Sequence, residues 1–141
     1  MALYSLIVSA QGSIAMPKPT RIHYARSRRE LELSFDDGHN YVLSAEFLRV
    51  HSPSAEVRGH GPGQEQLQTG KSKVAIEQLR PQGHYALQLV FDDGHDSGIY
   101  TWEYLRHLGE QQDTLWQTYL AQLAAAGASR DPDVQVVQFI P

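Results

Sequence analysis

Two copies of the tetrapeptide Asp-Asp-Gly-His contain residues that could perform acid–base chemistry. Neighbouring carboxylates can hold different pKa values and share the roles of acid and base. The same residues also suit a hairpin turn, because glycine adopts a positive φ angle and aspartate accepts hydrogen bonds from nearby backbone amides. A turn explains both copies by one mechanism, so we interpret the motifs as turns, although a turn explains their histidines less well. The motif residues are Asp36, Asp37, Gly38 and His39, and Asp92, Asp93, Gly94 and His95.

Both motifs lie inside a longer internal repeat. Apolar residues alternate over 31–35 and again over 87–91, which is the period of a half-buried strand. Beyond each turn, Ser44 and Thr101 stand where a helix N-cap is expected. Each unit is therefore predicted to be a strand, a turn, a strand and a capped helix. Two copies are too few for a solenoid, so the repeat indicates one compact domain with pseudo-symmetric halves.

The second unit is predicted to continue into a longer C-terminal helix. The first helix should end at Ser52-Pro53-Ser54, and a loop rich in Gly, Pro, Ser and Gln follows over about 52–72. The span from Trp102 to about Ala126 is interrupted only by Gly109, which could divide it into two helices. Its second half carries an apolar stripe at helical spacing, which we assign to the core. The predicted fold class is α+β, with a small antiparallel sheet of hairpins and two pseudo-repeated units.

The chain of 141 residues, 41% of them hydrophobic, is long enough for one core. We expect a tail over 1–20, a single domain over 21–126, and a linker and tail over 127–141. A translation start at Met16 is a further hypothesis, because the polar Pro-Lys-Pro-Thr follows it at once. The apolar segment 134–140 is expected to be an edge strand or an exposed tail.

The overall charge argues against nucleic acid as a partner. The formal net charge is −4, and the cluster Arg26, Arg28 and Arg29 is more typical of a solvated strand end than of a phosphate-binding surface. No apolar stretch approaches the length of a membrane span. The absence of cysteine excludes disulfides and thiolate metal sites, and fits a cytoplasmic protein.

The enzyme motifs that we considered do not occur in this sequence with the spacing that they require. Gly70-Lys71-Ser72 resembles the end of a phosphate-binding loop, but the spacing requires glycine where the chain has Glu65. The seven histidines include no pair at the spacing that places two imidazoles on one helical face, so we interpret them as scattered. We therefore predict no catalytic residue, no cofactor and no metal.

The chain resembles the DUF971 family, also called the gamma-butyrobetaine-hydroxylase-like N-terminal domain. The resemblance rests on a Leu-Arg pair followed by the segment 52–60, then on the second turn at 91–95 and on the segment 100–105, and it spans about 20–108. In gamma-butyrobetaine hydroxylase this domain precedes the catalytic jelly roll, and related domains are fused to Mrp-type iron–sulfur carrier ATPases. We expect this chain to be a stand-alone bacterial-type member that carries the module alone.

The resemblance also implies where a zinc ion would be held. Metal-binding members use a Cys-X-Cys-X-X-Cys segment and a histidine in the second turn, and these positions fall here on Ser52, Ser54, Val57 and His95. Serine is a poor replacement for a thiolate because it stays protonated near neutral pH. We expect no structural zinc. We expect instead that both serines and His95 form a hydrogen-bonded cluster, in which the serines cap the short helix and His95 bridges the repeats.

Two functional hypotheses follow. The first is a non-catalytic adaptor that binds a protein, with an iron–sulfur carrier or an oxygenase-type protein as the partner implied by the resemblance. The second is a small-molecule or metal-binding protein, or a small enzyme, that uses the loop 52–64 with His95. The candidate binding surface is a glycine-rich loop, which is alternatively a flexible connector. Its residues are Arg58, Gly59, His60, Gly61, Gly63 and Gln64.

Overall fold

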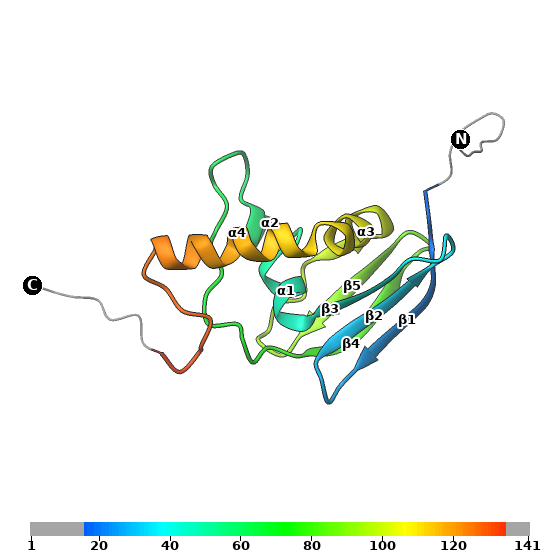
Figure 1. The fold of residues 1–141 in the computed structure, drawn as a ribbon, viewed down its shortest axis with the longest axis horizontal. Helices are drawn as coiled ribbons and strands as arrows, with labels where there is room; N and C mark the ends of the chain where they lie inside the picture. The colour runs from blue at the N-terminus through cyan, green and yellow to red at the C-terminus, as the bar shows by residue number, and fades with distance from the viewer. Residues whose placement is uncertain (1–15, 135–141) are drawn as a thin grey trace, which may run out of the picture.

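The computed structural model describes residues 16–134 and shows an α+β fold with two antiparallel sheets and four helices (Figure 1). This confirms the predicted fold class. The first sheet has the order β1-β2-β3 and the second has the order β4-β5-β6. The strands are β1 (Pro19–Ala25), β2 (Glu30–Phe35), β3 (Asn40–Ser44), β4 (Ile76–Gln82), β5 (Ala86–Phe91) and β6 (Ile99–Thr101). The helices are α1 (Ala45–Val50), α2 (Ala55–Arg58), α3 (Trp102–Glu110) and α4 (Gln112–Ala125).

Each half of the domain contains one strand more than the sequence predicted. In the first half β1 precedes the predicted hairpin of β2 and β3, and in the second half β4 precedes β5 and β6. The register of the leading strand shifts near its start in both halves, between Pro19 and Arg21 and between Ile76 and Gln78. The halves therefore share their element order and this irregularity. β1 begins at Pro19, which lies inside the segment expected as a tail.

Both Asp-Asp-Gly-His motifs are hydrogen-bonded turns. The backbone N–H of Phe35 donates to the carbonyl of His39 at 2.8 Å, and that of Phe91 donates to the carbonyl of His95 at 2.9 Å. The glycine of each turn has a φ angle near +90°, which side-chain-bearing residues rarely adopt. The helices that follow begin in the same way, because Ser44 Oγ and Thr101 Oγ1 each accept a hydrogen bond from the N–H three residues ahead.

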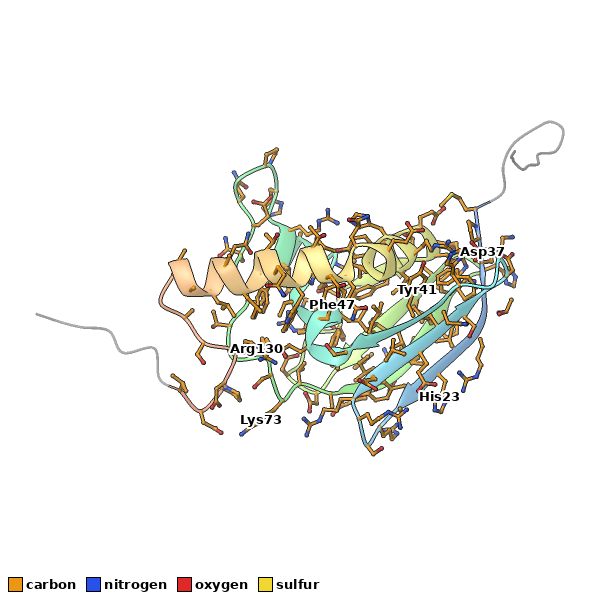
Figure 2. All side chains as sticks on the ribbon, viewed as in Figure 1. His23, Asp37, Tyr41, Phe47, Lys73 and Arg130 are labelled. Atoms are coloured by element: carbon orange, nitrogen blue, oxygen red, sulfur yellow. The ribbon has the colours of Figure 1, made fainter. Side chains whose placement is uncertain are left out.

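The core lies where the two sheets meet the helices that cover them (Figure 1). Alternate side chains of the central strands β2 and β5 are buried, as the period of two requires. Phe47 of α1 lies between its own helix and α4, with its ring centroid 6.3 Å from that of Trp116 (Figure 2). The alternating buried residues are Leu31, Leu33 and Phe35 of β2, and Leu87, Leu89 and Phe91 of β5.

The C-terminal helical region divides into a shorter and a longer helix, as expected, but the division lies at Gln111 and not at Gly109. Gly109 lies inside α3 because the ring of Tyr41 packs against it, and an added Cβ would lie 2.6 Å from that ring. The apolar stripe of α4 is partly core, since Tyr119 and Leu123 are buried. Among residues 16–134, no helix has the length and apolar character needed to cross a membrane.

Two features of the connecting segments were not predicted. The short helix α2 forms inside the segment expected to be loop. Residues 128–133 pack against the body of the domain, where the Arg130 guanidinium forms two hydrogen bonds with the buried Glu46 carboxylate, at 2.7 and 2.8 Å. Figure 2 shows Arg130 beneath α4, on the same side as Lys73. The strand or tail expected over 134–140 lies, apart from Val134, outside the described residues.

Candidate functional site

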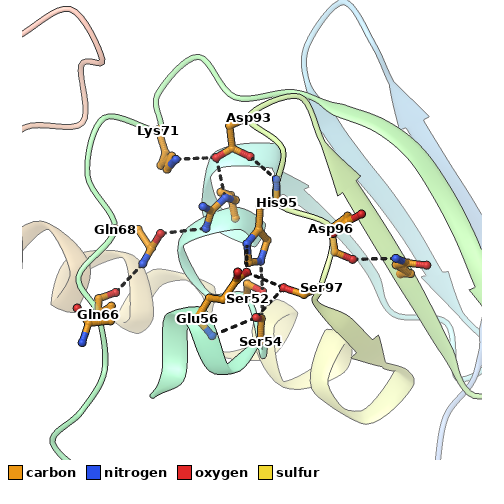
Figure 3. A network of polar contacts seen from close by, with 12 residues as sticks. Ser52, Ser54, Glu56, Gln66, Gln68, Lys71, Asp93, His95, Asp96 and Ser97 are labelled. Atoms are coloured by element: carbon orange, nitrogen blue, oxygen red, sulfur yellow. Dashed lines mark hydrogen bonds and ion pairs between the residues drawn. The ribbon is translucent and has the colours of Figure 1, made fainter. Parts of the chain in front are cut away.

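The positions that would hold zinc in metal-binding relatives are occupied by a polar network between the two halves (Figure 3). Ser52 Oγ lies 2.8 Å from His95 Nε2, and it also accepts a hydrogen bond from the N–H of Ser54 at 3.2 Å. His95 Nδ1 lies 3.1 Å from a carboxylate oxygen of Glu56. Because a carboxylate only accepts hydrogen bonds, Nδ1 carries the proton and the Ser52 hydroxyl donates to Nε2. The imidazole of the second half thus contacts both the residues that follow α1 and the helix α2, which lie in the segment that joins the halves.

Ser54 extends this network and starts α2. Its Oγ accepts a hydrogen bond from the N–H of Glu56 at 3.2 Å and lies 2.8 Å from Ser97 Oγ. The Ser97 hydroxyl in turn donates to Glu56 Oε1 at 2.7 Å. Ser54 therefore caps the newly identified helix, whereas Ser52 bonds to His95 and to the Ser54 N–H.

Val57, at the remaining ligand position, is buried and apolar. Within residues 16–134, no three side chains of His, Cys, Asp and Glu come together in an arrangement that could hold a metal ion. Every buried side-chain nitrogen or oxygen atom in that range has a hydrogen-bond partner. The network is thus closed, in the sense that each of its buried polar atoms already has a hydrogen-bond partner within the protein.

Burial, together with nearby positive charge, favours the neutral form of His95. Burial and the nearby Arg49 guanidinium lower the pKa of His95 below its ordinary value, against the opposing effect of Glu56. Arg49 Nε lies 2.9 Å from Asp93 Oδ2, and Lys71 Nζ lies 2.6 Å from the same oxygen. Burial raises the pKa of Asp93, but the hydrogen bonds from Lys71 and from the His95 N–H outweigh it and leave this pKa lowered.

The first turn has different surroundings. Asp37 accepts two hydrogen bonds from the Arg106 guanidinium of α3, at 2.7 and 3.0 Å. His39 is 62% exposed by its side chain and stacks on Tyr41, whereas the side chain of His95 is 5% exposed. The two motif histidines, which are alike in sequence, therefore differ in burial, although His39 Nδ1 also lies 3.3 Å from Arg106 Nη2 of the opposite half.

Sequence reasoning missed the partners that complete the network. Glu56 and Ser97 carry no signal of their own, because their contacts depend on how the halves pack. Gly98 is a further example, since a Cβ there would lie 2.5 Å from Ser52 Oγ. A glycine placed just before a short strand was the one available hint of close packing.

The predicted binding loop projects from the body of the domain beyond α2 (Figure 1). His60, Gly63 and Gln64 are exposed, and Gly61 is half-buried. Gly59 ends α2 with a φ angle of +75°, and a Cβ there would lie 2.2 Å from the carbonyl oxygen of Gln64. This close approach closes the loop into a compact shape. The loop does not reach His95, which lies in the closed network.

A cleft of about 680 Å³ lies next to the network. Three of the residues singled out in the sequence line it, namely Ser52, Val57 and Arg58, but neither His60 nor His95 does. The structure thus places Ser52, Val57 and Arg58 of the predicted site around one cleft, whereas His60 and His95 lie outside that cleft.

Residues 22–106 match the family model described as "Gamma-butyrobetaine hydroxylase-like, N-terminal". Two solved structures, each described as an NMR solution structure of a protein, are similar over almost the whole chain. One is 50% identical, covers 90% of this chain and 100% of its own, and has a TM-score of 0.75. The other is 45% identical, covers 97% and 100%, and has a TM-score of 0.72.

A third similar structure carries a family description. It is the crystal structure of a protein of unknown function from Acidithiobacillus ferrooxidans that belongs to the DUF971 family. It is 42% identical, covers 65% of this chain and 92% of its own, and has a TM-score of 0.56. The comparison with curated proteins gave no match.

Proposed function

Because the chain belongs to the gamma-butyrobetaine hydroxylase-like N-terminal family, also called DUF971, we propose that it is a non-catalytic module that binds another protein. The partner class is an iron–sulfur carrier or an oxygenase-type protein, as the fusions within this family suggest. The network of Ser52, Ser54 and His95 supports a binding role, since its buried polar atoms bond to one another and join separate segments of the fold.

The observation that carries this proposal is the projecting loop over 59–64. It places the His60 imidazole and the Gln64 amide in solvent, and the close approach of Gly59 to Gln64 fixes its shape. A loop that is held in one shape loses less conformational entropy on binding than a mobile connector does. The exposed imidazole and side-chain amide suit a partner surface that offers carboxylates or carbonyl groups.

The test starts with anaerobic capture of partners from the native cell extract, using the full 141-residue chain. Each captured protein is then purified, and its affinity is measured by titration calorimetry. The loop variant His60→Ala/Gln64→Ala should bind at least about tenfold more weakly than the wild type. The matched control is Arg26→Ala, an exposed residue in the β1–β2 turn, and it should bind normally. Equal binding by the loop variant, or no purified protein that binds, would overturn the proposal.

A further inference from the structure

The cleft beside the network has preformed walls. It is bounded by the end of α1, by α2, α3 and α4, and by the segment 65–68. The Tyr104 hydroxyl donates to the carbonyl of His51 and so ties α3 to the end of α1. The Tyr119 hydroxyl donates to the carbonyl of Gln68 at 2.7 Å and so ties α4 to the segment 65–68. The cleft volume of about 680 Å³ lies in the range of small-molecule sites.

Apolar side chains from four elements form much of the cleft surface. They are Val50 of α1, Val57 of α2, Leu108 of α3 and Leu115 of α4. Val50, Val57 and Leu108 are buried in the domain, and Leu115 is half-buried. A ligand with an apolar body would therefore remove both its own surface and the exposed part of this lining from water.

The hydroxyl groups of both cleft tyrosines are already engaged, and so is one nitrogen of His51. His51 Nδ1 lies 2.9 Å from the carbonyl of Phe47, so this nitrogen carries the proton. Burial lowers the pKa of His51, and the imidazole is therefore neutral near neutral pH. His51 thus adds no positive charge to the cleft.

Arg58 is a cationic residue of the cleft lining that lacks an ionic partner. It is exposed, and its guanidinium carbon lies 5.4 Å from the centroid of the Tyr104 ring, a cation–π contact with another residue of the lining. None of the ion pairs formed within residues 16–134 includes Arg58. Glu65 also lines the cleft, but it is exposed on the outer segment and is not paired with Arg58. The remaining titratable ring in the lining is that of His107, which stacks on Tyr104.

We propose that this cleft binds a small organic carboxylate with an apolar body. The carboxylate pairs with the guanidinium of Arg58, whose planar fork matches a carboxylate in a bidentate arrangement. The apolar body packs on Val57, Leu108 and Leu115. The site is separate from the projecting loop, because neither His60 nor Gln64 lines it. It therefore does not depend on the protein-binding role proposed above.

The test measures ligand binding to the purified full-length chain by heteronuclear NMR and calorimetry, without any partner protein. The probes are straight-chain monocarboxylates from acetate to decanoate, with the primary alcohols of equal length for comparison. Affinity should rise with chain length by about fourfold per methylene until the cleft is full. Each acid should bind at least about tenfold more tightly than its alcohol, because a charge-assisted hydrogen bond is lost in the alcohol. The shifted amide signals should be those of Val57, Tyr104, Leu108 and Leu115.

Two variants decide the role of the guanidinium. Arg58→Gln should reduce the affinity for acids by about tenfold and leave the affinity for alcohols unchanged, while Arg26→Gln should behave as the wild type. Superimposable spectra of the unliganded variants establish that the fold is intact. Absence of localised shifts with every acid would overturn the proposal. Equal affinities for acids and alcohols, or unchanged binding of acids by Arg58→Gln, would overturn it as well.

Discussion

Arg106 in α3 donates from Nη1 to Asp37 Oδ1 at 3.0 Å and from Nη2 to Asp37 Oδ2 at 2.7 Å, and so ties the helix of the second half to the turn of the first. The converse contact is also present, because Arg49 in α1 donates to Asp93 in the second turn at 2.9 Å. Each helix therefore contacts the turn of the opposite half. These contacts join segments that are far apart in the sequence, so they form only when both halves are folded and packed.

The Asp37 contact predicts a loss of stability in acid. The hydrogen bond from Arg106 holds the pKa of Asp37 well below its usual range. An unfolded aspartate titrates near about 3.9, so the contribution of Asp37 is complete above that pH and declines as the pH falls through the lowered native pKa. Urea unfolding measured between about pH 2 and about pH 6 should therefore show a shallower acid dependence for Asp37→Asn than for the wild type. The neighbouring Asp36→Asn should keep the steep dependence, and identical curves for all three proteins would contradict this prediction.

A second prediction concerns the bridging role of His95. Replacement by alanine leaves the buried Ser52 hydroxyl without its acceptor, so we expect the free energy of unfolding to fall by about 2 kcal/mol. Chemical denaturation measures this change. The matched control is His39→Ala in the first turn, where the side chain is exposed and the change should stay within about 0.5 kcal/mol. An unchanged midpoint for His95→Ala would show that His95 does not bridge the halves.

The zinc positions allow a gain-of-function experiment. Untagged wild-type protein should contain no stoichiometric zinc by mass spectrometry, because serine and valine supply no thiolate. The variant Ser52→Cys/Ser54→Cys/Val57→Cys, which keeps His95, should bind one zinc ion, since three thiolates and an imidazole form a common structural set.

Adding His95→Ala to that cysteine variant should weaken zinc binding, because one of the four ligands is lost. Stoichiometric zinc in the wild type, removed by the single His95→Ala change, would refute the expectation that this chain lacks the site.

A fourth prediction separates intrinsic helix preference from packing at Gly109. Alanine is favoured over glycine inside a helix by about 1 kcal/mol, so Gly109→Ala would stabilise an isolated α3. In the folded protein the new methyl group meets the ring of Tyr41, and we expect a net destabilisation of about 1–3 kcal/mol. Thermal unfolding should show the opposite sign once the ring is removed, with Gly109→Ala stabilising the Tyr41→Ala background. If both backgrounds respond alike, the ring is not the obstacle.

The sequence predicted correctly those features, such as turns and helix N-caps, that depend only on residues close together in the chain. The two turns carry the favoured glycine and aspartate, and the two N-caps carry a favoured hydroxyl, so the residue types were enough to locate these features. The helix α2 was missed because four residues are too few to show a helical period. Gly109 was misjudged because the packing of Tyr41 outweighs the usual tendency of glycine to interrupt a helix.

Contacts between the halves could be anticipated only in part. The cluster of Ser52, Ser54 and His95 was expected from the family pattern, whereas Glu56 and Ser97 complete it through packing that no local signal encodes. The cleft is a similar case. It combines residues from four helices and one loop segment, and their alignment depends on how α4 lies across the domain.

The two arginine–aspartate contacts between the halves are reciprocal, as the contacts across an isologous interface are. In such an interface the same surface occurs on both sides of a two-fold axis, and each copy supplies the complement of the other. A chain that ended after α1 would contain both Asp37 and Arg49, but it would need a second copy of itself to bring such a pair together. In these terms the two halves resemble the subunits of a two-fold dimer, and the segment 51–75 joins them in one chain. That connecting segment has no counterpart between the units of a true dimer, and it is the part of the chain that carries the projecting loop and several of the residues that line the cleft.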